Sequence, residues 1–318
     1  MAAYAVDFDA IVAAAGRIAG IAKRTPVHTC SALDEQTGYE LFFKCEQFQK
    51  VGAFKFRGAC NAVQQIPDDV KQRGVLTHSS GNHAQALALA AKQAGIPAHV
   101  VMPSNATPVK RQAVEGYGAR VIACQPTLQA REETAAKVGE ETGATFIPPY
   151  DHPHIIAGAG TAALELLDEV PDLDALVAPV GGGGLMSGSC LAARGKSSSI
   201  QLFAAEPKGA DDAARSLAAG ELIPQTNPLT IADGLLTSLG ELTWPIIRDH
   251  VDDIITVEEE EIVGAMRLLW ERAKLLVEPS AATSLAATLN DSFRQQCSGS
   301  RIGIILSGGN TNLDALPW

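Results

Sequence analysis

Lys55 stands between Phe54 and Phe56, a local context that could change the chemistry of its amine. Partial desolvation by neighbouring rings lowers the pKa of an amine and makes it a nucleophile for Schiff-base chemistry. A surface lysine beside two core phenylalanines would give the same pattern, and taken alone this simpler interpretation is the better one. Whether Lys55 is a reactive amine therefore has to be decided from other segments of the chain.

Three further segments place glycines and small polar residues where a strand is expected to end. Residues 79–83 read Ser-Ser-Gly-Asn-His, and amides opening a helix there would face an anion such as a carboxylate. An N-cap serine and a glycine turn explain this segment except for its histidine. Residues 181–184 are four glycines, and we favour convergence of their amides on a phosphate over a merely flexible loop. Residues 306–310 suit either a ligand in a cleft or an ordinary β-turn.

Two weaker signals are a glycine pattern and an acidic cluster. Residues 158–163 match G-x-G-x-x-A, but no proper strand precedes them and no acid follows at about 20 residues. We interpret them as a helix start whose small residues serve packing. Glu206, Asp211 and Asp212 could hold a divalent cation through oxygen ligands, although such acids are more often part of a solvated loop.

The elements that must position these segments alternate between strands and helices. We expect strands at 40–44, 74–78, 98–102, 120–124, 175–180, 202–205, 253–257 and 302–306. We expect helices at 84–94, 108–117, 127–142, 161–169, 258–274 and 280–289. The alternation predicts an α/β protein with two open, mostly parallel twisted sheets flanked by helices, and a ligand in the cleft between the two lobes.

Composition narrows the class of protein. The chain has 318 residues and a formal charge of −11, so we expect roughly two domains and no nucleic-acid partner. The N-terminus lacks a basic region followed by an apolar core, and no window is apolar for the roughly 18 residues that a membrane span needs. We therefore expect a cytoplasmic protein without membrane contact. Six scattered cysteines without metal-ligand spacing favour reduced thiols over a zinc site.

Together and in this order, the four segments resemble the serine racemase / serine–threonine dehydratase family of fold-type II pyridoxal-phosphate enzymes. The similarity extends from about Arg24 to Asn310 and includes residues 44–46, 156–158, 230–234 and 278–280. It implies a tryptophan synthase β-like architecture with a large domain, residues 1–73 and 152–318, that binds pyridoxal 5'-phosphate. It also implies a small mobile domain, residues 74–151, that closes over the substrate.

The resemblance also implies roles for individual residues. Lys55 would carry the cofactor covalently, and Ser80 would be the second catalytic acid/base on the opposite face. The cofactor would contact Phe54, Lys55, Asn82, Gly181, Gly182, Gly183, Gly184, Leu185 and Ser307. The substrate would contact Ser79, Ser80, Gly81, Asn82, His83, Arg131 and Ser238. A divalent cation (Mg²⁺ or Ca²⁺, with Mn²⁺ a further candidate) would be held by Glu206, the carbonyl of Ala210 and Asp212.

These roles imply an enzyme that interconverts L- and D-serine and also eliminates water from serine, giving pyruvate and ammonia. Ser80 argues against a threonine dehydratase, because those enzymes resemble Ser-Ala-Gly-Asn-His at this loop. The 3-hydroxyaspartate dehydratases share the double serine and residues 149–154, so an ammonia-lyase acting on 3-hydroxyaspartate, threonine or serine without significant racemisation is the alternative. Rivals from other classes are a non-catalytic cofactor-binding protein and a dinucleotide-dependent oxidoreductase.

The resemblance further predicts a homodimer. It also allows the positions that bind nucleotide in animal members of the family to be compared with this chain. Of the positions that contact nucleotide in animal members of the family, four are retained and three depart. The retained residues are Gln85, Tyr117, Lys274 and Asn310, and the departures are Val51, Cys30 and Ala32. The departures lose hydroxyl groups or bulk and argue against activation by ATP.

Overall fold

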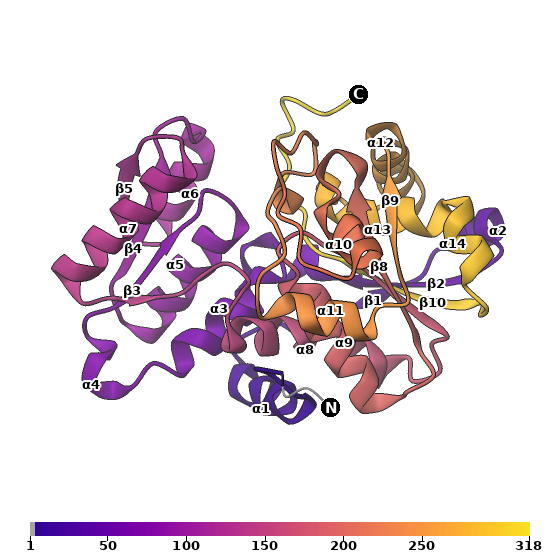
Figure 1. The fold of residues 1–318 in the computed structure, drawn as a ribbon, viewed down its shortest axis with the longest axis horizontal. Helices are drawn as coiled ribbons and strands as arrows, with labels where there is room; N and C mark the ends of the chain where they lie inside the picture. The colour runs from indigo at the N-terminus through magenta and orange to yellow at the C-terminus, as the bar shows by residue number, and fades with distance from the viewer. Residues whose placement is uncertain (1–3) are drawn as a thin grey trace.

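The computed structural model describes residues 4–318, which form two domains, each built on one twisted sheet (Figure 1). The larger sheet has six strands in the order β1-β2-β10-β7-β8-β9, and the smaller has four in the order β5-β4-β3-β6. All neighbouring strands are parallel except β1, which is antiparallel to β2. The predicted α/β class with two mostly parallel sheets is confirmed.

The strands are β1 Val27–His28, β2 Glu40–Cys45, β3 Val75–His78, β4 Ala98–Pro103, β5 Arg120–Cys124, β6 Thr145–Phe146, β7 Ala175–Pro179, β8 Gln201–Pro207, β9 Asp253–Val257 and β10 Arg301–Leu306. The helices are α1 Phe8–Ile18, α2 Ser31–Thr37, α3 Lys55–Gln64, α4 Asp68–Lys71, α5 Asn82–Ala94, α6 Pro108–Gly116, α7 Leu128–Thr142, α8 Pro153–Glu169, α9 Gly184–Lys196, α10 Asp212–Ala219, α11 Thr243–His250, α12 Glu259–Leu268, α13 Pro279–Leu289 and α14 Asp291–Gln296. A π-helix, Leu269–Ala273, follows α12 and ends at Lys274, whose φ is 58°.

Helices cover both faces of the six-stranded sheet because successive side chains of a strand point to opposite faces. In β7, Leu176 and Ala178 pack against α1, α8, α9 and α11, whereas Ala175 and Val177 pack against α2, α12, α13 and α14. Strands buried on both faces consist mostly of apolar residues, with exceptions such as Lys44 in β2 and Glu206 in β8, which is why the sequence predicted them well. β1 and β6 were not expected, since two residues are too few to form such a run.

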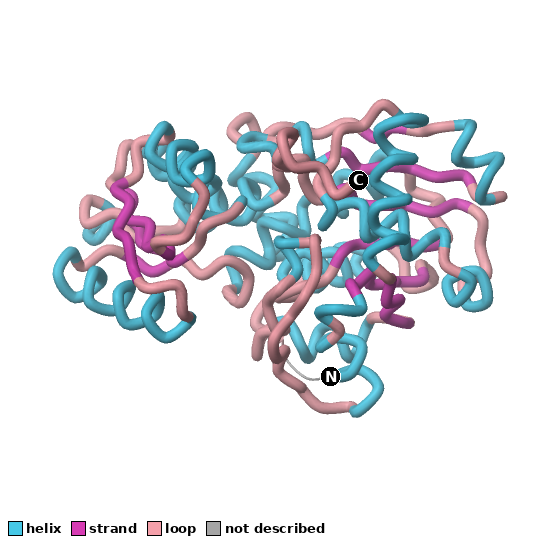
Figure 2. The backbone as a smooth tube through the Cα atoms, turned by 90° about the horizontal axis from the view of Figure 1, so that it is seen from above, coloured by secondary structure: helices cyan, strands magenta, loops and turns pink. Residues whose placement is uncertain are grey.

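The smaller sheet has α5 and α6 on one face and α7 on the other. Helix α3 packs against both α5 of the small domain and α8 of the large domain. Figure 2, seen from above, shows the two sheets with their helices at opposite ends of the molecule. The boundaries at residues 74 and 151 and the mobility of the small domain stay predictions.

The interpretation of residues 158–163 as a helix start is wrong, because α8 already begins at Pro153. Both glycines of the pattern lie inside the helix and serve packing, as expected. A Cβ on Gly158 would come within 2.7 Å of the Cα of Gly58 in α3, and one on Gly160 within 2.7 Å of the carbonyl oxygen of Gly188 in α9. Helices α3, α8 and α9 therefore touch backbone to backbone.

Candidate active site

Lys55, the first residue of α3, reaches the segment that leads from the small domain back to the large one. Its Nζ donates a hydrogen bond to the carbonyl of Pro149 at 2.7 Å and lies 5.1 Å from the ring centroid of Phe54. Burial lowers the pKa of Lys55 to about 8, although the carboxylate of Glu278 counteracts this effect. At pH 7 about a tenth of this amine is therefore neutral and nucleophilic, far more than for a lysine of ordinary pKa.

The backbone before Lys55 is paired with the segment after β10. The amide of Phe54 donates to the carbonyl of Ser307 at 3.0 Å, and the amide of Gly309 donates to the carbonyl of Gly52 at 2.9 Å. The turn that allows this pairing has Val51 at φ 58° and Gly52 at φ 70°. A positive φ is strained for a β-branched residue, so the surrounding contacts must hold Val51 in place. The structure thus brings together two of the four segments that the sequence singled out.

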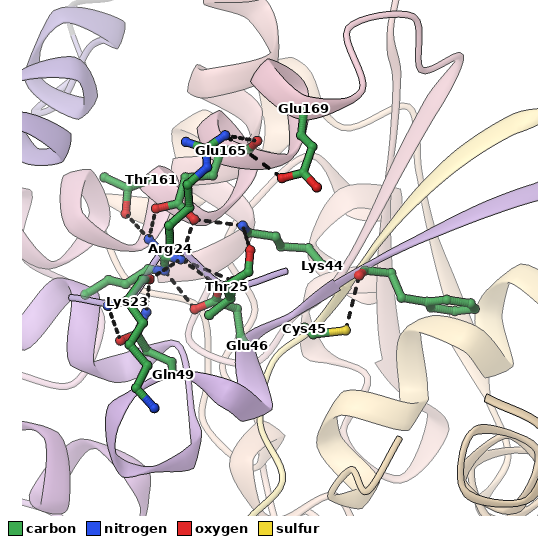
Figure 3. Close-up of polar contacts among 12 residues, drawn as sticks. Lys23, Arg24, Thr25, Lys44, Cys45, Glu46, Gln49, Thr161, Glu165 and Glu169 are labelled. Carbon is green, nitrogen blue, oxygen red and sulfur yellow. Dashed lines mark hydrogen bonds and ion pairs between the residues drawn. The ribbon is translucent and has the colours of Figure 1, made fainter. Parts of the chain in front are cut away.

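A buried charge network fixes the first turn of α3 to the large domain. Arg57 is fully buried and donates from Nε to Glu46 at 2.7 Å and from Nη1 to Glu165 at 2.8 Å. Lys44 pairs with the other oxygen of Glu165 at 2.7 Å. Figure 3 shows Lys44 from β2, Glu46 from the turn after β2 and Glu165 from α8 converging. Removing one partner from such a buried network costs about 3–5 kcal/mol. The turn that carries Lys55 is therefore rigid.

The double-serine loop lies between β3 and α5. Ser79, Ser80 and Gly81 are half-buried, and the amide of Gly81 donates to the Ser79 hydroxyl at 3.4 Å. Asn82 is the first residue of α5, so the loop forms the N-terminal end of a 13-residue helix, where backbone amides favour anions. This placement suits the predicted binding of a substrate carboxylate.

His83 is buried behind this loop and does not point out of it as a charged group. Its Nε2 lies 3.0 Å from the carbonyl of Ile147. Burial and the positive charge of Lys55 lower the pKa of His83 to about 3. The ring is therefore neutral at physiological pH and gives the loop no positive charge.

Glu278, at the start of α13, joins this site although sequence reasoning assigned it no role. Its carboxylate accepts from Asn82 Nδ2 at 2.9 Å and from the amide of Asn310 at 3.0 Å. The Asn82 amide is fixed on its other side as well, since its Oδ1 accepts from Asn310 Nδ2 at 2.8 Å. Burial raises the pKa of Glu278 to about 7, and Asp233 adds to the effect. Glu278 followed by Pro279 at a helix start was the signal that could have drawn attention to it.

The glycine run follows β7 and opens α9, with Gly183 at φ 84°. These glycines meet close neighbours. A Cβ on Gly181 would lie 2.9 Å from the Cα of Leu235, and one on Gly182 would lie 2.3 Å from Cγ of Tyr150. The bare backbone is required by packing, and the amides at the start of α9 remain suited to a phosphate. Leu185, which follows the run, is buried.

A short strap, residues 149–151, connects Lys55 with the glycine run. Pro149 accepts from Lys55, the Tyr150 ring packs on Gly182, and Asp151 Oδ1 accepts from the amides of Leu242 and Thr243 at 2.9 and 3.2 Å. Sequence reasoning noted this strap only as a family likeness.

The two residues expected at the far end of the substrate lie on different domains. Arg131, in α7, is half-buried with a buried Nε that has no partner among residues 4–318, and its charge contributes to lowering the pKa of His78. The Ser238 hydroxyl accepts from the amide of Gln225 at 2.8 Å. Within residues 4–318, no hydrogen bond or ion pair joins either residue to Lys55, Asn82 or Glu278.

Glu206 and Asp212 form a buried acidic pair at the end of β8 and the start of α10. Glu206 accepts from the amides of Ala213 and Ala214, both at 2.9 Å, and Asp212 Oδ2 accepts from the amide of Leu239 at 3.0 Å. Burial raises the pKa of Glu206 to about 8 and that of Asp212 to about 6.

Asp212 Oδ1 is buried without a partner in the described chain. Asp211 bonds to Arg215 instead of joining the pair. Within residues 4–318 no three His, Cys, Asp or Glu side chains gather, so a cation here would need further oxygens such as the carbonyl of buried Ala210 and water. The orphaned carboxylate oxygen is the feature that fits a cation ligand.

A nucleophilic lysine, a clamped asparagine and a glycine run lie between two α/β domains, and this arrangement defines an enzyme that binds a phosphorylated carbonyl cofactor. The chain belongs to the family described as pyridoxal-phosphate dependent enzyme, whose model matches residues 18–308. The residues present fit this cofactor, because the Lys55 pKa is lowered and the glycine run leaves no room for a Cβ.

Individual relatives are similar over nearly the whole chain. The chain is 53% identical to a serine racemase of Arabidopsis thaliana over 318 residues, covering 98% of this chain and 96% of the relative. It is 48% identical to a beta-hydroxyaspartate dehydratase of Paracoccus denitrificans, covering 99% of each. The structure of maize serine racemase superposes with a TM-score of 0.96 at 50% identity, covering 98% of this chain and 95% of that one. Within residues 4–318, none of the helices has the length and apolar character needed to cross a bilayer.

Proposed function

We propose that the protein is a pyridoxal-phosphate-dependent serine racemase that also eliminates water from serine to give pyruvate and ammonia. One observation carries the proposal. Lys55 Nζ donates to the carbonyl of Pro149 at 2.7 Å, and His83, which follows the double-serine loop, lies 3.0 Å from the carbonyl of Ile147 in the same segment, so this segment brings the lysine and the loop together. The similar serine racemases of plants support the same assignment.

The residues around Lys55 divide the work of proton transfer. When bound, the cofactor supplies an electron sink that makes the α-hydrogen of an amino acid acidic. The Lys55 amine takes or returns that proton on one face, and the Ser80 hydroxyl does so on the other. Racemisation needs both groups, whereas elimination of water needs only one proton-abstracting face. The ratio of the two reactions therefore depends on Ser80.

The remaining residues hold the reactants. The amides of residues 79–82 at the start of α5 bind the substrate carboxylate, and residues 181–184 bind the cofactor phosphate. Asn82, Ser307 and Phe54 would hold the cofactor ring, with Ser307 supplying a neutral hydroxyl rather than a carboxylate for its nitrogen. Arg131 and Ser238 would contact the far end of the substrate.

A 3-hydroxyaspartate ammonia-lyase is the second candidate. It is favoured by Arg131, whose buried Nε has no partner in the described residues and would suit a second carboxylate. The similar dehydratase of Paracoccus denitrificans points the same way. The test is chiral analysis of the product from L-serine with a parallel pyruvate assay, repeated with threonine and 3-hydroxyaspartate. Formation of D-serine supports the racemase, and turnover of 3-hydroxyaspartate alone would replace it with the lyase.

We also propose that Glu206, Asp212 and the carbonyl of Ala210 bind a divalent cation, with Mg²⁺, Ca²⁺ and Mn²⁺ as candidates. Two buried carboxyl groups and an orphaned oxygen support this assignment. Glu206 and Asp212 bond to backbone amides and not to Lys55, so the cation would act on stability and loop order rather than on the reacting atoms. Carboxylate and carbonyl oxygens suit all three ions.

A homodimer is supported by one surface of the large domain. Phe48 and Leu276 are 47% and 44% exposed, and Gln47 and Leu276 both flank Gly309. Gln47 is buried, yet its amide has no partner among residues 4–318. A second copy of the chain would cover the apolar side chains there. Light scattering of the wild type and of Phe48→Glu tests this, and a wild-type monomer at micromolar concentration would contradict it.

Cytoplasmic location, the absence of ATP activation and closure of residues 74–151 over substrate stay predictions.

A further inference from the structure

Thr243, the first residue of α11, is fully buried against the glycine run. Its Oγ1 donates a hydrogen bond to the carbonyl of Gly182 at 2.9 Å and accepts one from the amide of Gly240 at 2.9 Å. A Cβ placed on Gly183 would lie 2.8 Å from both Cβ and Oγ1 of Thr243. One side chain therefore binds one glycine of the run and packs on the next.

The backbone of Thr243 is held from two other sides. Its amide donates to Asp151 Oδ1 at 3.2 Å, and its carbonyl accepts from the Ser187 hydroxyl at 3.1 Å. Ser187 lies in the first turn of α9, directly after the glycine run, and is fully buried. These contacts come from different elements and fix the backbone of Thr243, while its hydroxyl has the Gly182 carbonyl as its shorter acceptor and the Gly240 carbonyl, at 3.3 Å, as a longer one.

Asp151 also connects Thr243 to the reactive lysine. It lies two residues after Pro149, whose carbonyl accepts from Lys55 Nζ at 2.7 Å. A continuous path therefore runs from Lys55 through the strap to Thr243 and on to Gly182. A pyridoxal phosphate held by Lys55 at its aldehyde and by the glycine run at its phosphate would span the two ends of this path, so the distance between them would have to match the length of the cofactor.

We propose that Thr243 is a positioning residue that holds the glycine run in register with Lys55 for the cofactor phosphate. The proposal rests on the proposed role of residues 181–184 as the phosphate site. Loss of the hydroxyl would leave the buried carbonyl of Gly182 and the half-buried amide of Gly240 without this partner, and the loop would relax away from the position that suits the phosphate. The aldehyde end of the cofactor does not depend on this contact.

The test compares the affinity of cofactor-free protein for pyridoxal phosphate and for pyridoxal, which lacks the phosphate. The variants are Thr243→Val, which removes the hydroxyl at nearly constant shape, and Thr243→Ser, which restores it. Thr288→Val is the matched control, because Thr288 is equally buried but bonds to Ser284 within its own helix, α13. Melting temperatures show which variants fold. If Thr243→Val does not fold, Ser187→Ala, which frees the carbonyl of Thr243, takes its place.

We expect Thr243→Val to raise the dissociation constant for pyridoxal phosphate by roughly tenfold or more. Thr243→Ser and Thr288→Val should stay within about threefold of the wild type, and pyridoxal should bind all proteins alike. Unchanged phosphate-cofactor affinity in Thr243→Val, or an equal loss for both compounds, overturns the proposal. If the wild type bound both compounds equally tightly, the glycine run would not be the phosphate site and the proposal would fall with it.

Discussion

Asn82 of the small domain donates from Nδ2 to both carboxylate oxygens of Glu278 in the large domain, at 2.9 and 3.2 Å. Both residues open helices, α5 and α13, and Asn310 completes the group. The asparagine expected to face the cofactor ring is thus held by the opposite domain. Movement of the small domain would change the orientation of this amide as well as the width of the cleft.

Replacing Glu278 by Gln should change how stability depends on pH. Burial raises the pKa of Glu278 from its ordinary value of 4.5 to about 7, so its contribution to stability is greatest below pH 4.5 and is lost as the pH rises through 7. The free energy of unfolding of the wild type relative to Glu278→Gln should therefore fall by on the order of 3 kcal/mol between about pH 5 and 8, and melting temperatures measured across this range follow the fall. A constant difference across this range would show that Glu278 does not titrate there.

Covalent loading of the cofactor-free protein should follow the titration of Lys55. Its pKa is lowered to about 8, and only the neutral amine attacks an aldehyde, so the loading rate should rise with pH and level off above about 8. An ordinary lysine would level off near 10.5. The visible absorbance of the bound cofactor measures the rate. Lys55→Ala should lose this absorbance and Lys50→Ala should keep it; the opposite result would assign the cofactor to another lysine.

Ser80→Ala should separate the two proposed reactions. Removing the hydroxyl takes away the proton donor of one face and leaves Lys55 on the other, so racemisation should fall by roughly 100-fold or more while elimination from L-serine is largely kept. Chiral chromatography and pyruvate formation on the same samples measure the two rates. Equal loss of both activities would contradict a role for Ser80 as the second acid/base.

Divalent cations should stabilise the protein more at pH 8 than at pH 6. The pKa values of Glu206 and Asp212 are raised to about 8 and 6, so a cation must displace protons at the lower pH and binds more tightly as these groups ionise. Melting temperatures with and without Mg²⁺ measure the effect. Asp212→Asn should abolish it, whereas Asp174→Asn, a change at an exposed aspartate that also accepts backbone amides, should not. An Mg²⁺ shift that persists in Asp212→Asn would place the cation elsewhere.

Sequence reasoning succeeded where the signal is local. The strand ends were marked by apolar runs that give way to glycine and serine, so the pattern of residue types was enough to find residues 79–83, 181–184 and 306–310. It placed the start of α8 too late, because Pro153 at the first helical position and His152 before it were not used as a start signal.

The contacts that complete the site have no such local signal. Glu278 and Asn82 are 196 residues apart, and Thr243 meets Gly182 across 61 residues. Nothing in the immediate neighbourhood of Thr243 distinguishes it from any other residue that starts a helix. Contacts of this kind become visible only when the sheet order brings the elements together.

The glycine contacts between α3, α8 and α9 have a consequence for the fit of the cofactor. Helix α3 starts at Lys55 and α9 starts at Gly184, and α8 lies between them with its Gly158 and Gly160 backbones touching both neighbours. Because these glycines have no side chains, the backbones of the three helices lie in direct contact. This contact sets the distance between the start of α3 at Lys55 and the start of α9 at Gly184. A methyl group added at Gly158 would push α8 away from α3. The distance between Lys55 and the amides proposed to bind the phosphate would then no longer match the cofactor.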